Sequence, residues 1–507
     1  MVRDGVIAFV GPDQQAHALG GGADALEVDL GGRLVTPAFV DAHVHCVQVG
    51  QVADGLDLHG ARNRQEVLAA VAAYAHTRPG ARIVVGQGWD ERGWPDAVPP
   101  TRLELDRAAP GVAVYLARVD VHSAVVSSAL LDRLPDVSGL PGFEASGWLT
   151  QDAHHRCRGQ MDSLFTDGER RSAVRAALTE AARQGVATVH ELGGPHLGPL
   201  QDLVRVREEA AALGLQAVTY WGELATPESL GRARWAGAVG LAGDLCVDGA
   251  IGSHTAALQE PYADASTRGV RYLSDEQISA HVLACTRAGV QAGFHCIGDD
   301  AVAAAVNGLR RAAEELGTEA VRTARHRLEH VEMVDRCDLA TLAELGVVAS
   351  VQPAFDAAWG GPGELYASRL GVRARTMNPF GDLHRAGVAL AFGTDAPVTP
   401  LAGWETVRAA VQHGRPDQRL DVTVAFDAAT RGAHRAARDD GAGTLRVGGR
   451  ADLAVWDLDP ELLEPLSGLP RLQVGDPLPA CVATLGGGRV LHADAATLGK
   501  LPACHRR

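Results

Sequence analysis

From Val40 onward the sequence alternates short apolar runs of β-prone residues with Ala-rich stretches of helical periodicity. This alternation is typical of βα units that surround a parallel sheet. Ten runs have strand character, and they begin near residues 40, 83, 112, 186, 215, 245, 290, 326, 347 and 388. A (β/α)8 barrel of the TIM type has eight strands, so two of the runs must lie outside it.

The runs near residues 83 and 112 are the best candidates for the two extra strands. They lie in a stretch of about residues 50–165 that is rich in Pro, Trp and turns and has poorer helical connections. We therefore predict an α/β fold in which residues 37–445 form the barrel, with this stretch inserted after the first strand. The chain length of 507 residues suits a large barrel with an added module.

The two ends of the chain have a different pattern from the middle. Residues 1–36 and 446–507 contain short strand-like runs separated by glycine-rich turns. Neither segment is long enough to form a core alone. We expect the two ends to pair into one composite β-sandwich beside the barrel.

Composition excludes several classes of function. The net charge is −15, and the only basic run is the terminal His505-Arg506-Arg507, which argues against nucleic acid as a partner. The eight cysteines are scattered without a Cys-x-x-Cys motif, which favours reduced thiols. The sequence lacks the apolar core of a signal peptide and any run long enough to span a membrane, so we expect a cytoplasmic protein. Whether it forms a homo-oligomer stays open.

A histidine pair ends the first predicted strand. His43 and His45 are two residues apart, so alternation along the strand points both side chains to one face, where they can bind one divalent metal ion. Two partly buried histidines without a ligand are the plainer alternative. Three further residues, His295, His330 and Asp395, follow predicted strands 5, 6 and 8, and the carboxyl ends of barrel strands meet at one rim. Such a set suits a divalent ion such as zinc, and the carboxylate can accept a proton from activated water.

At this point the sequence resembles the amidohydrolase superfamily, specifically the YtcJ-like branch or amidohydrolase family 3. The resemblance covers essentially the whole length and is carried by five motifs in the family's order: residues 35–45 (VTPAFVDAHVH), 248–258 (DGAIGSHTAAL), 295–299 (HCIGD), 327–330 (RLEH) and 393–398 (GTDAPV). The resemblance implies a metal-dependent hydrolase on a (β/α)8 barrel. It implies metal-ligand positions at His43, His45, His295 and His330, and it implies that Asp395 carries a proton from water to the leaving group.

One position departs from the family pattern. Many relatives have a lysine four residues before the Asp-Gly pair on strand 4, and this lysine, once carboxylated, bridges two metal ions; here the position is Asp244. Asp244 could replace the bridging group or leave room for a single ion. Cys246 and Asp248 share its face of the predicted strand and could contribute as well. The sequence favours one tightly held ion and leaves a second open.

Five residues are candidates for substrate binding, each with a structural alternative. His122 and Trp89 lie in the insertion, which covers the pocket mouth in relatives, although packing is the better interpretation for Trp89. Glu191 ends predicted strand 2 and could line the pocket or belong to a hydrogen-bonded rim pair. His254 follows strand 4, either near substrate or as an exposed loop residue. Gln352, near the end of strand 7, could bind a substrate amide or satisfy the backbone.

Two acidic residues adjoin the predicted metal ligands. Asp299 lies four residues after the strand-5 histidine, and Glu329 directly precedes the strand-6 histidine. Carboxylates in such places commonly accept a hydrogen bond from a ligating imidazole and fix its tautomer. Glu329 could equally pair with Arg325 or Arg327.

The sequence therefore predicts a metal-dependent hydrolase that acts on carbon–nitrogen bonds other than peptide bonds. The expected substrates are small molecules with an amide, N-acyl or N-formyl amine group. Two alternatives stay open: a catalytically weak metal-binding homologue with a regulatory or assembly role, suggested by Asp244, and a deaminase of heterocycles, which would use the same ligands.

Overall fold

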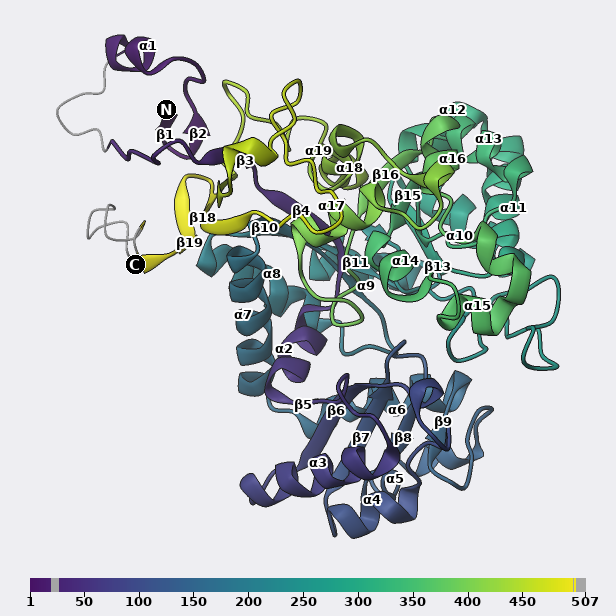
Figure 1. The fold of residues 1–507 in the computed structure, drawn as a ribbon. Coiled ribbons are helices and arrows are strands. Elements are labelled where there is room, and N and C mark those ends of the chain that lie inside the picture. Colours follow the sequence, from purple (N-terminus) through teal and green to yellow (C-terminus); the bar gives the residue numbers. More distant parts are fainter. Residues whose placement is uncertain (20–26, 496, 498–507) are drawn as a thin grey trace.

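The computed structural model describes residues 1–19, 27–495 and 497, and a parallel eight-stranded sheet lies at its centre (Figure 1). Neighbouring strands follow the order β16-β15-β14-β13-β12-β11-β10-β4. Their bounds are β4 (Phe39–Val44), β10 (Val186–Gly193), β11 (Gln216–Trp221), β12 (Gly240–Leu241), β13 (Gln291–Cys296), β14 (Arg327–His330), β15 (Val348–Val351) and β16 (Ala389–Phe392). The segment after β16 closes the ring, because Val44 bridges Ala396 and the Asp395 amide donates to the His43 carbonyl at 2.7 Å. The predicted barrel is confirmed.

Helices follow the strands, and most of them cover the outside of the barrel (Figure 1). They are α7 (Asp167–Arg183), α8 (Gln201–Leu213), α9 (Pro227–Ala236), α10 (Asp275–Ala288), α11 (Asp299–Leu316), α12 (Thr318–Ala324), α13 (Arg336–Glu344), α14 (Pro353–Trp359), α15 (Leu365–Leu370), α16 (Phe380–Arg385), α17 (Gly403–Val411), α18 (Val422–Ala428) and α19 (Arg431–Ala436). Local sequence sets several of their ends. For example, α10 starts with a capping box between Ser274 and Gln277 and ends at Gly289 in the left-handed conformation.

The fourth barrel strand differs from the sequence prediction. We expected it at residues 245–248, but β12 covers only Gly240–Leu241, where it pairs with β11 and β13. The chain then turns at Gly243, whose φ of +88° favours glycine, and a Cβ there would lie 2.8 Å from a Leu192 side-chain carbon. Asp244 consequently lies at the carboxyl end of the strand, on the rim where barrel active sites form.

The insertion after the first barrel strand has a sheet of its own. After α2 (Cys46–Asp54), a five-stranded sheet has the order β5-β6-β7-β8-β9 and forms the lobe at the bottom of Figure 1. The runs near residues 83 and 112 belong to it, so the barrel has the predicted eight strands. The bounds in this lobe are β5 (Leu56–Asp57), α3 (Arg64–Thr77), β6 (Ile83–Trp89), α4 (Arg102–Ala108), β7 (Ala113–Arg118), β8 (Ala124–Val126), α5 (Ser128–Leu131), β9 (Trp148–Leu149) and α6 (Gln151–Gln160).

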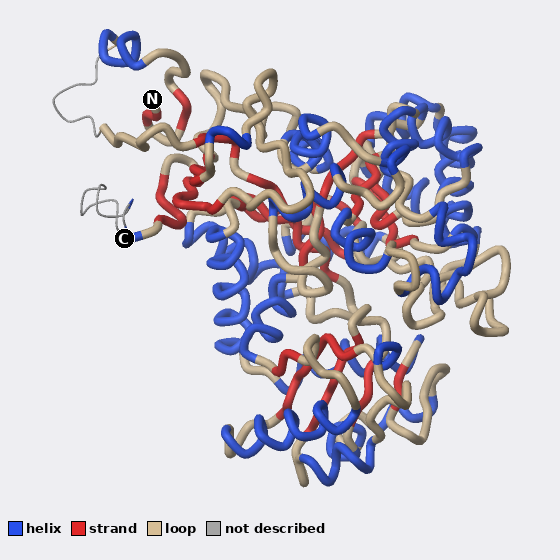
Figure 2. The backbone as a smooth tube through the Cα atoms, in the orientation of Figure 1, coloured by secondary structure: helices blue, strands red, loops and turns tan. Residues whose placement is uncertain are grey.

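Strands from both ends of the chain pair beside the barrel. β3 (Leu34–Pro37) pairs with β17 (Leu453–Asp457), which continues through β18 (Ala480–Gly486) to β19 (Arg489–Ala493). A hairpin of β1 (Val2–Arg3) and β2 (Val6–Ile7) adjoins this sheet, followed by α1 (Asp13–Ala18). Figure 2 shows these strands on the side of the barrel where both termini lie. Residues 20–26, 496 and 498–507 of the predicted terminal module lie outside the described residues.

Within the described ranges, no helix combines the length and the apolar character that crossing a bilayer requires.

An aromatic cluster joins the terminal sheet to the barrel. Phe39 packs edge-on against Trp404, Phe426 and Trp456, with ring centroids 5.1–5.6 Å apart. The indole nitrogen of Trp456 donates to the Thr36 hydroxyl at 2.8 Å. Since Phe39 begins β4 and Trp456 lies on β17, this cluster links the first barrel strand to the part of the terminal sheet that comes from the C-terminal end of the chain.

We expect Trp456→Ala to destabilise the fold strongly. Removing a buried tryptophan costs about 3–5 kcal/mol, because packing contacts are lost and a cavity remains. The midpoint of thermal unfolding, followed by circular dichroism, should fall clearly. Trp235→Ala is the matched control, since Trp235 is 64% exposed and should change little. Equal midpoints for the two variants would show that the terminal sheet does not depend on this cluster.

Candidate metal centre

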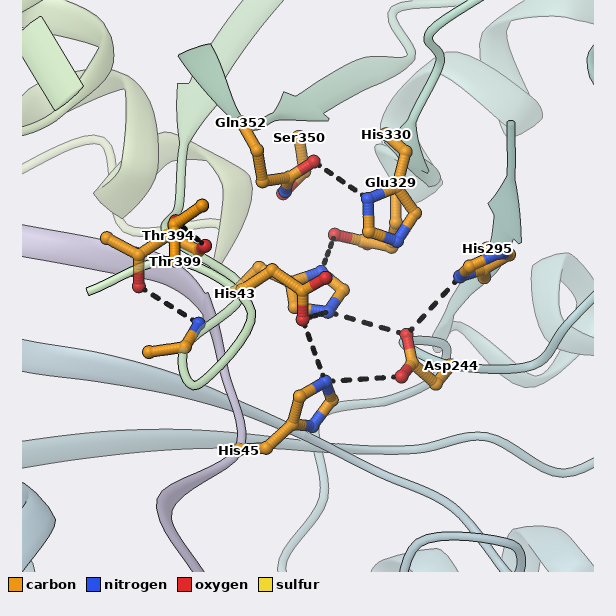
Figure 3. A network of polar contacts seen from close by, with 12 residues as sticks. His43, His45, Asp244, His295, Glu329, His330, Ser350, Gln352, Thr394 and Thr399 are labelled. Carbon is orange, nitrogen blue, oxygen red and sulfur yellow. Dashed lines mark hydrogen bonds and ion pairs between the residues drawn. The ribbon is translucent and has the colours of Figure 1, made fainter. Parts of the chain in front are cut away.

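The six predicted ligands converge at the carboxyl end of the barrel, and Figure 3 shows His43, His45, Asp244, His295 and His330 among them. All six are buried, and they come from the ends of β4, β13 and β14 and from the loops three residues after β12 and β16. They are His43, His45, Asp244, His295, His330 and Asp395.

Two carboxylates lie between the imidazoles. The His43 Nε2 atom is 3.4 Å from Asp244 Oδ1 and 3.4 Å from Asp395 Oδ1. The His45 Nε2 atom is 3.2 Å from Asp244 Oδ2 and 3.0 Å from Asp395 Oδ1. His295 Nδ1 is 3.9 Å from Asp244 Oδ1. Each oxygen of Asp244 therefore faces a different histidine.

Three overlapping groups of residues have ligand atoms within 4.8 Å of one another. One group combines His43, His330 and Asp395, another combines His43, His45 and Asp244, and the third combines Asp244, His295 and His330. Because Asp244 belongs to two of them, the structure brings it into the centre at the position where many relatives have lysine.

Hydrogen bonds behind the imidazoles fix their tautomers. His43 Nδ1 lies 2.9 Å from Glu329 Oε2, and His330 Nδ1 lies 2.8 Å from Gln352 Oε1. A carboxylate or a carbonyl oxygen can only accept, so both Nδ1 atoms carry a hydrogen and a metal ion would bind the Nε2 lone pairs. Burial lowers the pKa of His43, but Asp395, Asp244 and Glu329 outweigh burial and raise it well above its usual range, so an ion would displace the proton from its Nε2. These lone pairs point into the centre, as metal ligation requires.

Unpartnered buried atoms test whether a cation fits this centre. His43 Nε2, His330 Nε2 and Asp244 Oδ1 are buried and have no hydrogen-bond partner among the described residues. A buried polar atom without a partner costs about 1–3 kcal/mol, and a bound ion would remove that cost. Imidazole nitrogens with carboxylate oxygens are the ligand set of zinc sites in proteins. The residues present therefore fit a divalent metal ion.

The electrostatics of the centre favour a cation. Burial raises the pKa of Asp395 and of Asp244, but the neighbouring histidines outweigh this effect and hold both pKa values below the ordinary range. Both carboxylates stay ionised at neutral pH as a result. Burial, together with His295 and His43, lowers the pKa of His330 to about 3, so this imidazole is neutral and able to bind a metal.

Two of the ligands have unusual backbone conformations. His330 has a φ of +71° and Asp395 a φ of +55°. The left-handed region costs a residue other than glycine roughly 1–2 kcal/mol, and such conformations cluster at functional sites. The fold thus stabilises an unfavourable backbone at two positions of the centre.

A small cavity of about 20 Å³ lies beside the ligands. His295, His330 and Asp395 form its polar end, where the His122 ring lies 5.1 Å from the His295 ring. Burial, followed by the influence of His295, holds the pKa of His122 well below its usual range, so His122 is neutral. Of the predicted substrate-binding residues, His122 is the one that lines this cavity.

The other four candidates have different surroundings. Gln352 supports His330, and its Nε2 atom has no partner among the described residues. Glu191 accepts a hydrogen bond from the Cys46 amide at the start of α2, so its interaction is with the backbone. His254 is bound to Asp264 at 2.9 Å and does not line the cavity.

Trp89 is not a substrate-binding residue in this structure. Its side chain is completely buried against Trp94 and Trp148 in the insertion, and its indole nitrogen donates to the Leu116 carbonyl. An indole with every face packed and its N–H satisfied has no surface left for a ligand. The structural alternative is the correct interpretation.

Two further acids bind backbone amides. The Asp248 carboxylate accepts hydrogen bonds from the amides of Ile297, Gly298 and Ala257. Asp299 accepts from the Gln259 amide instead of fixing an imidazole. Both residues thus shape the loops next to His295, and Asp248 Oδ1 also lies 3.9 Å from His295 Nε2.

Sequence reasoning missed the apolar end of the cavity. Glu332, Phe355, Trp359 and Tyr366 line it, together with Leu365 and Val398. Glu332 follows the predicted ligand His330 by two residues, and an acid in the run His-Val-Glu-Met was a signal that could have been found. Burial raises the pKa of Glu332 to about 8. The aromatic residues gave no such signal, because their approach depends on how α14 and α15 pack.

We expect Gln352→Leu to weaken metal binding by about 10–100-fold, the usual cost of losing an outer partner of a ligating imidazole. Without the amide oxygen, His330 Nδ1 loses its acceptor and the ring is free to change tautomer. Competition with a chromophoric zinc chelator measures the affinity. The control is Gln48→Leu, because the Gln48 side chain binds the Leu197 carbonyl away from the ligands. Equal affinity in both variants would contradict the role of Gln352.

Comparison with known proteins agrees with this geometry. A family model described as "Amidohydrolase family" matches residues 26–492. The chain belongs to the amidohydrolase family. This confirms the resemblance found in the sequence and makes the chain a hydrolase of carbon–nitrogen bonds in a metal-dependent family.

Two sequence relatives of this amidohydrolase match over nearly the full length. The putative amidohydrolase YtcJ of Bacillus subtilis (strain 168) is 27% identical and covers 92% of this chain and 91% of its own. The N-substituted formamide deformylase of Arthrobacter pascens is 24% identical and covers 91% and 90% respectively.

A solved structure gives the same picture. An uncharacterized metal-dependent hydrolase from Pyrococcus horikoshii OT3 superposes with a TM-score of 0.73 at 26% identity. The match covers 92% of this amidohydrolase and 95% of that chain.

Proposed function

We propose that this amidohydrolase cleaves the amide bond of small N-acyl or N-formyl amines and that Asp395 moves the proton. The position of Asp395 carries the proposal. Of the two carboxylates in the centre, Asp395 lines the cavity and Asp244 does not. Asp395 is therefore the carboxylate that can reach both the ligand cluster and a bound substrate.

We propose zinc as the ion, with His43, His45, His295, His330 and Asp395 as ligands. Asp244 fits as a ligand shared by two groups of histidines, which is compatible with one ion or two. When bound, a zinc ion supplies Lewis acidity, which polarises a carbonyl and lowers the pKa of water from 15.7 to about 7.

The residues of the chain then supply the proton steps. Asp395 accepts a proton from water as the water oxygen forms its bond to the carbonyl carbon. It returns the proton to nitrogen as the carbon–nitrogen bond breaks, and the products are a carboxylic acid and an amine. His122, neutral and beside His295, can donate a hydrogen bond to the carbonyl oxygen.

The N-substituted formamide deformylase of Arthrobacter pascens supports this substrate class, because its name describes removal of a formyl group from nitrogen. The cavity is consistent with it, because its lining combines polar groups such as His295 and Asp395 with apolar side chains that could hold the substituent on nitrogen.

The test is a screen of zinc-loaded protein with N-formyl and N-acetyl derivatives of benzylamine and aliphatic amines. We expect release of the free amine, detected with an amine-reactive dye. Metal-loaded protein that releases no amine from any of them would contradict the proposal and favour a catalytically weak homologue. Release of ammonia from a heterocycle, without amide cleavage, would favour a deaminase.

A further inference from the structure

Aromatic side chains from α14 and α15 form one wall of the cavity. The Phe355 and Trp359 rings on α14 have centroids 4.8 Å apart, and Tyr366 on α15 packs edge-on against Trp359 at 6.1 Å. Phe355 is nearly parallel to the His330 ring. The wall thus begins at a metal ligand and leads away from it, along the path that a substituent of the substrate would take.

One carboxylate oxygen of Glu332 has no close hydrogen-bond partner at the same cavity. Its side chain is 3% exposed and lines the cavity, and its Oε2 atom has no hydrogen-bond partner among the described residues. The Tyr366 hydroxyl makes a loose hydrogen-bond contact with this carboxyl and lowers its pKa, but the contact does not satisfy Oε2. A buried carboxyl that served only the fold would have its oxygens bound to nearby donors.

Glu332 differs from the other acidic side chains of the cavity in its lack of an ion pair. Three acidic side chains line the cavity. Asp395 faces His43 and His45, and Asp120 lies 3.6 Å from the Arg118 guanidinium and accepts a hydrogen bond from Ser253. Glu332 has no ion pair among the described residues, and neither lysine nor arginine lines the cavity. It is also absent from the groups of residues that could hold the metal.

We propose that Glu332 determines specificity by binding a protonated nitrogen on the substrate, other than the nitrogen of the bond that is cleaved. The substrate class is then an N-acyl or N-formyl diamine whose apolar or aromatic spacer packs on Phe355 and Trp359. A cation next to aromatic faces is further stabilised by their quadrupoles. This inference rests on the proposed function, since it assigns a second contact of the same substrate.

The test compares two amines that differ in one charged group. Both para-xylylenediamine and para-ethylbenzylamine resemble reaction products and share one aminomethyl group, so any contact of that group with zinc is common to both. We expect zinc-loaded protein to bind the diamine at least about tenfold more tightly by titration calorimetry, the effect of one charge-assisted hydrogen bond. Glu332→Gln should abolish this preference and leave binding of para-ethylbenzylamine unchanged.

Glu364→Gln is the matched control. Glu364 is exposed at the start of α15, so this variant removes the same charge from the neighbourhood without touching the cavity. It should keep the preference for the diamine. Loss of the preference in both variants would show a long-range charge effect and overturn the assignment.

Equal binding of the two amines by the wild-type protein would also overturn the assignment of Glu332. This comparison needs no variant, so it tests the assignment even if Glu332→Gln fails to fold. An equal loss of both amines in Glu332→Gln would overturn the assignment as well. The mono-N-formyl derivatives of the two amines separate this inference from the proposed function. If the protein prefers the diamine in binding but cleaves neither derivative, the proposed function fails and the role of Glu332 is supported. If it cleaves both derivatives equally and binds the two amines equally, the proposed function is supported and the role of Glu332 fails.

Discussion

Asp395→Asn should lower kcat by about 10²–10⁴-fold, the usual contribution of a general base and acid. An asparagine side chain keeps an oxygen near His45 but can neither take a proton from water nor return one to nitrogen. Three or more imidazole ligands remain, so the variant should still bind zinc. Steady-state kinetics on an N-formyl amine and elemental analysis of the same preparation measure the two effects.

The matched control is Asp457→Asn at the end of β17. This aspartate has a side chain that is 61% exposed, and it pairs with Arg33 in the terminal sheet, far along the chain from the ligands. It should have the kcat of the wild type. An Asp395→Asn variant with wild-type kcat would exclude Asp395 from the proton steps, and one without zinc would mean that Asp395 acts chiefly as a ligand.

Asp244→Ala should weaken zinc binding by at least about 100-fold. Loss of an outer partner alone costs about 10–100-fold, and Asp244 lies in the centre itself, with its two oxygens facing different histidines. Asp244 and Asp395 are the two carboxylates that lie between the imidazoles, so removing Asp244 takes away one of the two negative charges that attract the ion. Competition with a chromophoric chelator gives the affinity.

Cys246→Ala is the control for Asp244→Ala, because it changes a buried side chain two residues away. The Cys246 sulfur lies 3.8 Å from His196 Nε2 and belongs to none of the groups of residues that could hold the metal. The variant should bind zinc as the wild type does. If Asp244→Ala and Cys246→Ala bound zinc equally well, Asp244 would be no ligand and a single ion held by the other residues would suffice.

The sequence was sufficient to predict the barrel and the meeting of the ligands. Alternating βα units specify a parallel barrel, and side chains after different strands of such a barrel meet at one rim whatever the details of packing. His295, His330 and Asp395 could therefore be placed together with His43, although they lie hundreds of residues apart along the chain.

What the sequence could not show depends on exact backbone geometry. β12 is only two residues long and is followed by a turn at Gly243, so neither its position nor the direction of Asp244 follows from alternation along a longer strand. The cavity wall was missed for a related reason. Phe355 and Tyr366 reach the cavity through the packing of short helices, and Glu332 becomes distinctive only when its lack of a partner is visible.

The most direct test of the account is an anomalous diffraction map recorded at the zinc edge from crystals of the zinc-loaded protein. We predict a peak about 2.0–2.2 Å from the imidazole nitrogens and carboxylate oxygens that bind it, with His43, His45, His295, His330 and Asp395 around the site. Zinc-saturated crystals with no peak at these five residues, or with a peak only elsewhere on the chain, would contradict the metal centre and the hydrolysis that depends on it.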